Sequence, residues 1–131
     1  MTGSVEDSQL KDVLLAEGCL IQQAEITHSV IGVRSMIASG TKIKDSILMG
    51  ADYYLDVADT DPSKPPIGIG PRCHIEGAII DKNARLGADV VIRPFPPGTD
   101  IKNEKYFVKD GIVVIPKNGV LTSGTKIVPS A

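Results

Sequence analysis

The fold is decided by residues 19–43, CLIQQAEITHSVIGVRSMIASGTKI, where a large aliphatic side chain recurs every five or six residues. A small or β-branched residue stands two places before each of them, as in Cys19-x-Ile21 and Thr41-x-Ile43. Side chains two residues apart share one face of a strand, whereas a helix repeats its apolar residues at intervals of three and four. The stretch therefore predicts a series of very short strands.

The same pairing continues through most of the chain in three runs. No stretch between them reads as a crossover helix, so the strands are expected to be parallel and joined by tight corners. Three hexads make one triangular turn, and turns stack around a shared core. The sequence thus predicts an all-β parallel β-helix of hexapeptide repeats with about four to five coils. The large residues lie at Ile21, Ile26, Ile31, Ile37, Ile43 and Met49 (from Ile47-x-Met49), then at Ile69, Ile75, Ile80, Leu86 and Ile92, and finally at Ile115, Leu121 and Ile127.

A single domain is expected over residues 1–131, interrupted twice. One interruption is acidic and rich in proline, and the other contains Pro94-Phe95-Pro96-Pro97-Gly98. Such composition indicates segments that leave the coil. The expected parts are a tail at 1–6, first coils at 7–50, a loop at 51–66, further coils at 67–92, an excursion at 93–110 and a last coil at 111–128.

Composition and charge narrow the range of possible functions. Aromatic residues make up only 4% of the chain and tryptophan is absent, which suits a narrow, repetitive interior. The net charge of −2 comes without a basic run, so nucleic acid is not an expected partner. No apolar stretch has the length of a membrane span, and residues 1–6 carry no secretion signal. Cys19 and Cys73 match neither a disulfide framework nor a zinc motif, so both are expected to be reduced and buried.

Several strings are more specific than the repeat. They include MGADYY at 49–54, IIDKNARLG at 79–87 and GIVVIPKN at 111–118, besides residues 17–19, 28–35 and 66–70. In this order they resemble the C-terminal domain of glucose-1-phosphate adenylyltransferases (ADP-glucose pyrophosphorylases), especially the plant small-subunit and cyanobacterial type. The resemblance extends from about residue 7 to 128.

The resemblance implies a left-handed β-helix with a regulatory and oligomerisation role. The full enzyme converts ATP and glucose 1-phosphate to ADP-glucose and pyrophosphate for glycogen or starch synthesis, with Mg²⁺, on an N-terminal nucleotidyltransferase domain. The glycine-rich nucleotide loop of that domain has no counterpart in this chain. We therefore expect no catalytic residue, metal ligand or cofactor here, and an inactive chain when alone. The implied partners are the N-terminal domain, other subunits of a tetramer and an anionic effector, in cytoplasm or plastid.

Two lysines match the family's effector site. Lys82, in DKNAR, and Lys117, in IPKN, correspond to lysines that bind an anionic sugar phosphate or phosphate, ligands that require cationic donors on a rigid frame. They are 35 residues apart, or about two coils, and are expected on one face. Asp81 is expected to orient Lys82, and Arg34 and Arg85 are weaker candidates. Residues 93–100 differ from the family pattern, which leaves the effector's identity open.

Other functions on the same fold remain alternatives. A hexapeptide-repeat acyltransferase needs a histidine general base, for which His28 and His74 are the only candidates. His74 stands between the inward residues Cys73 and Ile75, so it is predicted to point outward. A β-helix carbonic anhydrase needs three histidine ligands for zinc, which two positions do not supply. A structural assembly module without a ligand is the third alternative.

Overall fold

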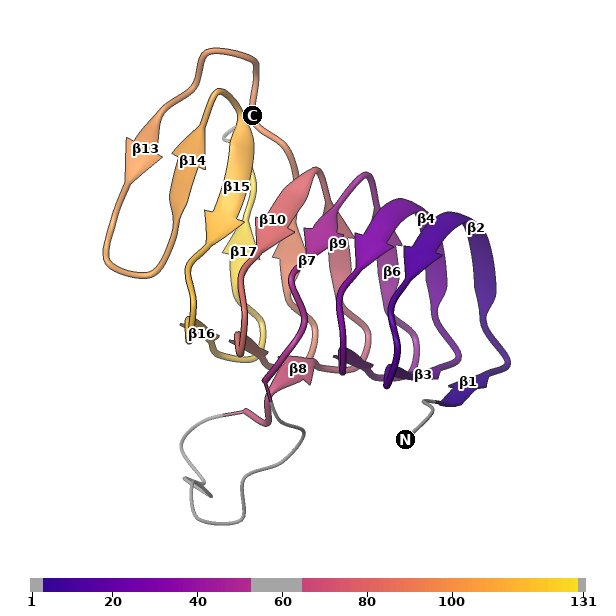
Figure 1. Ribbon diagram of the computed structural model, residues 1–131. Coiled ribbons are helices and arrows are strands. Elements are labelled where there is room, and N and C mark those ends of the chain that lie inside the picture. The colour runs from indigo at the N-terminus through magenta and orange to yellow at the C-terminus, as the bar shows by residue number, and fades with distance from the viewer. Residues whose placement is uncertain (1–3, 53–64, 130–131) are drawn as a thin grey trace.

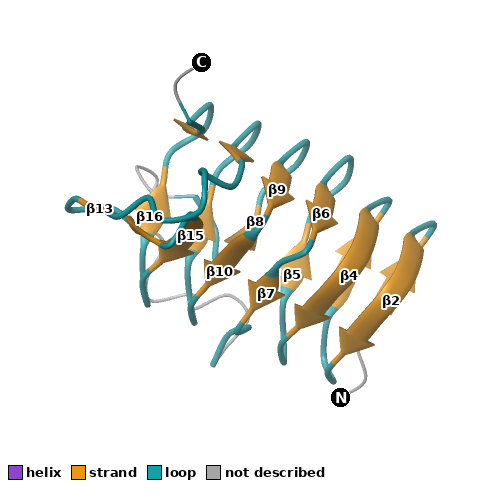
Figure 2. Ribbon diagram, turned by 90° about the horizontal axis from the view of Figure 1, so that it is seen from above, coloured by secondary structure: helices purple, strands orange, loops and turns teal. Residues whose placement is uncertain are grey.

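The computed structural model describes residues 4–52 and 65–129, and the regular secondary structure in these ranges is entirely β-strand. The strands form stacked triangular coils, with the N-terminal and C-terminal coils at opposite ends of the stack (Figures 1 and 2). Each side of the triangle is a flat face built on parallel strands. We call the three sides face A, face B and face C.

Face A is a six-stranded parallel sheet, the first of the two sheets that the described residues form. Its strands are β1 (Ser4–Glu6), β3 (Leu20–Gln22), β5 (Met36–Ile37), β8 (Gly68–Ile69), β11 (Arg85–Leu86) and β16 (Val120–Leu121), in that order.

The second sheet bends around one corner and forms faces B and C. Its two long strands, β2 (Gln9–Leu15) and β4 (Glu25–Ile31), run across that corner and contribute to both faces. Face B continues with β6 (Lys42–Lys44), β9 (His74–Glu76), β12 (Val91–Ile92) and β17 (Lys126–Ile127), and face C with β7 (Ile47–Leu48), β10 (Ala78–Ile80) and β15 (Ile112–Ile115), followed by the antiparallel β14 (Phe107–Lys109) and β13 (Ile101–Lys102).

The core consists of three columns of aliphatic side chains, one behind each face. Strand register places each large residue directly over its equivalent in the next coil, as with Ile43, Ile75 and Ile92 on face B. A fully buried side chain of this size contributes about 2 kcal/mol through removal of apolar surface from water. The columns, all at most 5% exposed, are Ile21, Ile37, Ile69, Leu86 and Leu121 on face A; Ile26, Ile43, Ile75, Ile92 and Ile127 on face B; and Ile31, Leu48, Ile80 and Ile115 on face C.

One predicted pair, Ile47-x-Met49, is wrong by one residue. Leu48 is the inward residue, with 4% exposure, whereas Ile47 and Met49 are 41% and 44% exposed. The corner between faces B and C accounts for the difference, because it advances the inward position by five residues rather than six. Its central residue has a positive φ in successive coils, including His28 (47°) and Asp45 (51°).

The expected division of the chain into parts also differs from the structure in detail. Residues 4–6, expected as part of a tail, form β1 and pair with β3. The predicted loop at 51–66 falls mainly on residues 53–64, which lie outside the described ranges. The segment 93–110 carries β13 and β14, which add an antiparallel hairpin to the edge of β15 and so extend face C. Val108 of this hairpin is 2% exposed.

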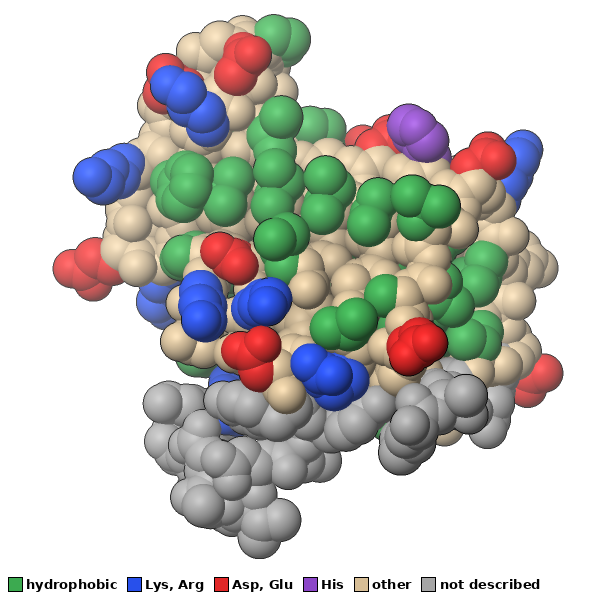
Figure 3. All heavy atoms as spheres, viewed as in Figure 1, with side chains coloured by type: hydrophobic (Ala, Val, Ile, Leu, Met, Phe, Trp, Pro, Cys, Tyr) green, Lys and Arg blue, Asp and Glu red, His purple; other side chains and the backbone are tan. Residues whose placement is uncertain are grey.

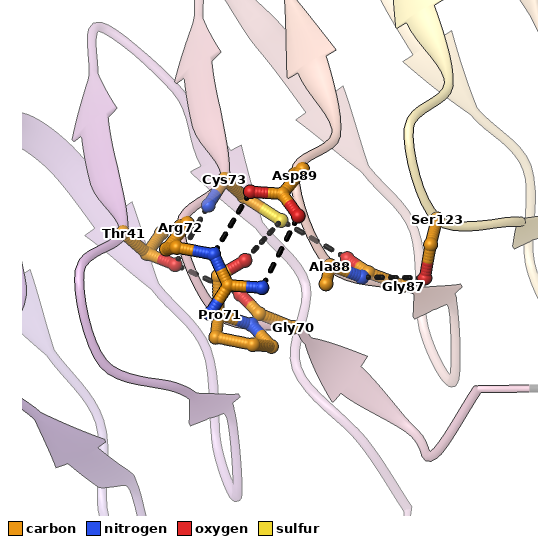
Figure 4. A network of polar contacts seen from close by, with 9 residues as sticks. All are labelled: Thr41, Gly70, Pro71, Arg72, Cys73, Gly87, Ala88, Asp89 and Ser123. Carbon is orange, nitrogen blue, oxygen red and sulfur yellow. Dashed lines mark hydrogen bonds and ion pairs between the residues drawn. The ribbon is translucent and has the colours of Figure 1, made fainter.

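Polar groups at the corners bind one coil to the next. The Thr41 hydroxyl donates to the Gly70 carbonyl and accepts from the Cys73 N–H, at 2.8 and 3.2 Å (Figure 4). The Cys73 thiol donates to the Gly87 carbonyl at 3.1 Å, and burial raises its pKa. Cys19 is likewise free and buried. The expectation of two reduced, buried cysteines is therefore confirmed.

Candidate anion-binding site

The candidate site lies at the corner where face C turns into face A. Lys82 and Lys117 each follow a paired face C residue, Ile80 and Ile115, by two positions. The N–H of Asn118 donates to the Lys82 carbonyl at 2.9 Å, so the two lysines occupy equivalent positions on adjacent coils. The predicted separation of two coils is therefore wrong, because the 93–110 hairpin consumes chain length without completing a coil. Both lysines lie at the same corner of the stack rather than on one of its faces.

Asp52 completes this corner, and sequence reasoning missed it. Its carboxylate Oδ1 lies 3.5 Å from Lys82 Nζ, while its Oδ2 accepts a hydrogen bond from Asn83 Nδ2 at 3.1 Å. The Asp52 N–H donates in return to Asn83 Oδ1 at 2.9 Å. We call Asp52, Lys82, Asn83 and Lys117 the lysine corner.

The lysine corner has a buried base and an exposed rim. Asn83 is 5% exposed and has a φ of 61°, a left-handed conformation that asparagine tolerates better than most residues. The side chains of Lys82 and Asp52 are 43% and 45% exposed. The hydrogen bond from Asn83 and the charges of Lys82 and Lys117 lower the pKa of the Asp52 carboxyl. Asp52 is therefore an anion at neutral pH, held beside the lysines by a buried amide.

The other predicted site residues surround this corner with different roles. Asp81 accepts a hydrogen bond from the Lys82 backbone N–H at 2.7 Å, so its contact is with the main chain. Arg34 Nε donates to the Ala51 carbonyl at 2.9 Å, next to Asp52. Arg85 Nη1 donates to the Pro65 carbonyl at 3.2 Å. Arg34 thus contacts the chain just before residues 53–64, next to Asp52, and Arg85 contacts it just after them.

Comparison with known proteins identifies the domain. The model of the GLGC left-handed parallel beta-helix domain matches residues 2–126 of the chain. The chain belongs to this family. It is also 45% identical over 129 residues to the glucose-1-phosphate adenylyltransferase small subunit, chloroplastic/amyloplastic, of Triticum aestivum. That match covers 94% of this chain but 27% of the wheat protein, so the GLGC domain spans about a quarter of its relative's length. The left-handed fold expected from the resemblance is confirmed.

The two histidines of this GLGC domain lie at different places on the coil. His28 Nδ1 lies 2.8 Å from Asp45 Oδ1 at the corner between faces B and C, with 77% of its side chain exposed. His74 lies on face B and points outward, as predicted, since the inward position beside it belongs to Ile75. Within residues 4–52 and 65–129, no three His, Cys, Asp or Glu side chains are grouped as metal ligands. The same ranges contain no helix with the length and hydropathy of a membrane span.

Face C of the GLGC domain carries a second feature, an unbroken row of outward apolar side chains. Strand register aligns them one per strand from β2 to β14. Figure 3 shows the row crossing the molecule above a group of basic and acidic side chains. The corresponding row on face B is mostly polar: Glu25, Lys42, His74, Val91 and Lys126. The members of the apolar row, as we name it, are Leu14, Val30, Ile47, Ile79, Val114 and Phe107.

The apolar row is accessible in this chain. Leu14 is 71% exposed, and Val30, Ile47 and Phe107 are 39–41% exposed. Soluble monomers rarely expose a contiguous apolar patch beyond a few hundred Å², and larger patches mark interaction surfaces. Face C therefore presents an aligned row of apolar side chains where face B presents a mostly polar one.

Proposed function

We propose that the chain is the regulatory and oligomerisation domain of a glucose-1-phosphate adenylyltransferase, with the chemistry carried by another part of the enzyme. The observation that carries the regulatory role is the pairing of Lys82 and Lys117 on adjacent coils of a rigid frame. Two lysines placed on adjacent coils in this way can provide charge-assisted hydrogen bonds for a phosphate or sugar phosphate. The wheat relative is named as chloroplastic/amyloplastic, so the plastid is the compartment we propose of the two expected.

The regulatory role is tested by titrating inorganic phosphate and 3-phosphoglycerate into the chain and following the lysine signals by NMR. Saturable shifts are expected at Lys82 and Lys117. Lys117→Ala is expected to weaken binding by about tenfold or more, because a hydrogen bond between charged groups contributes about 1.5–3 kcal/mol. Lys126→Ala, which removes the same charge from face B, is the matched control. The proposal fails if no saturable shift occurs at tens of millimolar ligand, or if both variants weaken binding equally.

The assembly role rests on the apolar row. Because the chain spans only 27% of its wheat relative, we propose that the remaining part of such an enzyme, the nucleotidyltransferase domain, covers face C. Apolar burial would drive this packing. A polar face B left in solvent is consistent with that orientation.

Packing on face C is tested by retention of the chain on the immobilised N-terminal part of the wheat small subunit. Wild-type chain is expected to be retained, and Ile47→Glu to be lost, because an unpaired carboxylate in the centre of the row would be buried. Lys42→Glu also introduces a glutamate, on face B, and is expected to be retained. Equal behaviour of the two variants, or no retention of the wild type, would rule out the proposed packing.

A further inference from the structure

The ligand-free lysine corner already contains an anion. The Asp52 carboxylate lies 3.5 Å from Lys82 Nζ and is close enough to Lys117 to be influenced by its charge. A phosphate would bind to the same ammonium groups, because they are the cationic hydrogen-bond donors of the lysine corner. Asp52 and the ligand would therefore occupy the same position beside Lys82, so that one excludes the other.

Asp52 is held in place by more than its charge. Two hydrogen bonds join it to Asn83, one through its N–H and one through its carboxylate. Asn83 is itself buried and bonded to the preceding coil, where its N–H donates to the Gly50 carbonyl at 3.1 Å. A carboxylate positioned in this way acts at a high effective concentration, as any tethered group does.

We propose that Asp52 is a built-in competitor that must leave Lys82 before an anion can bind, which favours phosphate dianions over singly charged anions. The inference rests on the proposed anion site and concerns its regulation. A singly charged anion gains little by replacing a tethered carboxylate of equal charge, because the lysine exchanges one ion pair for another. A phosphate dianion brings more charge and three acceptor oxygens, so it can engage both lysines and displace Asp52.

The test compares Asp52→Asn with Asp45→Asn by NMR titration with inorganic phosphate. Both changes remove one negative charge from an aspartate whose side chain is about half exposed, 45% and 47%, and which contacts a basic side chain. Asp52→Asn is expected to tighten phosphate binding about fivefold or more, whereas Asp45→Asn changes it less than twofold. Chloride is expected to compete with phosphate more effectively in Asp52→Asn than in the wild type.

The outcomes separate this inference from the site on which it rests. Phosphate binding that is unchanged or weaker in Asp52→Asn, with shifts still seen at Lys82 and Lys117, overturns the competitor role and leaves the anion site intact. Absence of binding in every form, including Asp52→Asn, overturns the anion site itself. Asp52→Ser provides a second variant if the amide disturbs the corner, and unchanged face B signals establish that each variant is folded.

Discussion

Replacement of Ile75 by alanine is expected to lower the free energy of unfolding by about 2–5 kcal/mol. Ile75 is fully buried and lies in register between Ile43 and Ile92 in the face B column. The stacked coils on either side hydrogen-bond to one another, so they cannot move inward to fill the space left by the lost side chain. The change is measured by urea denaturation, from the midpoint at constant m-value.

Ile47→Ala is the matched control, since it removes the same atoms from β7 on face C. Ile47 points outward and is 41% exposed, so its truncation is expected to cost less than about 1 kcal/mol. If the two variants were equally destabilised, the assignment of inward and outward positions in these coils would be incorrect.

The repeat could be predicted because the triangular core restricts every inward position in the same way. Each face of a coil places one large side chain toward the axis, and a polar residue there would have no partner for its hydrogen bonds. Small residues such as Ser46, which is 2% exposed, precede the large ones because the corner has little room. These restrictions recur in every coil and therefore appear in the sequence as a period.

The prediction of inward residues was incomplete or wrong in two places. In the first coil the packing restriction is weaker, and at Ile47-x-Met49 the period of the repeat changes. The first coil was only partly predicted, and its inward residues Val5, Leu10 and Leu15 are 38–43% exposed, because no further coil among the described residues covers them. At Ile47-x-Met49 the period shortens from six to five, and both outward neighbours of Leu48 are apolar. Hydrophobicity alone then cannot separate inward from outward positions.

The site was predicted less completely than the fold. Lys82 and Lys117 came from a resemblance, and their spacing in the sequence misled because the hairpin at 93–110 adds residues without adding a coil. Asp52 was missed because it contacts Lys82 and Asn83 on the next coil, and the repeat pattern of the sequence is interrupted between these positions. The sequence offered one signal for Asp52. Its carboxylate comes two residues after Gly50, and Gly50 stacks beneath Lys82 on the adjacent coil.

Gly70→Ala is expected to destabilise the chain by about 3 kcal/mol through a steric conflict between adjacent coils. A Cβ atom on Gly70 would lie 2.4 Å from the Gly87 carbonyl oxygen and 2.5 Å from its carbon. Neither coil can yield easily, because the Gly70 N–H donates to the Leu86 carbonyl at 2.9 Å and the Gly70 carbonyl accepts from Thr41. The loss is measured by thermal and urea denaturation.

Gly98→Ala separates this steric conflict from backbone strain. Gly98 has a φ of +88°, but a Cβ atom there would meet nothing within 4 Å. Its substitution is expected to cost only about 1–2 kcal/mol, the penalty of a left-handed conformation for an L-residue. Gly70 has no such φ, so its larger loss would come from the close approach of the coils alone. A loss at Gly70 no greater than that at Gly98 would mean that adjacent coils separate readily, and that the stack is not the rigid frame required for anion binding.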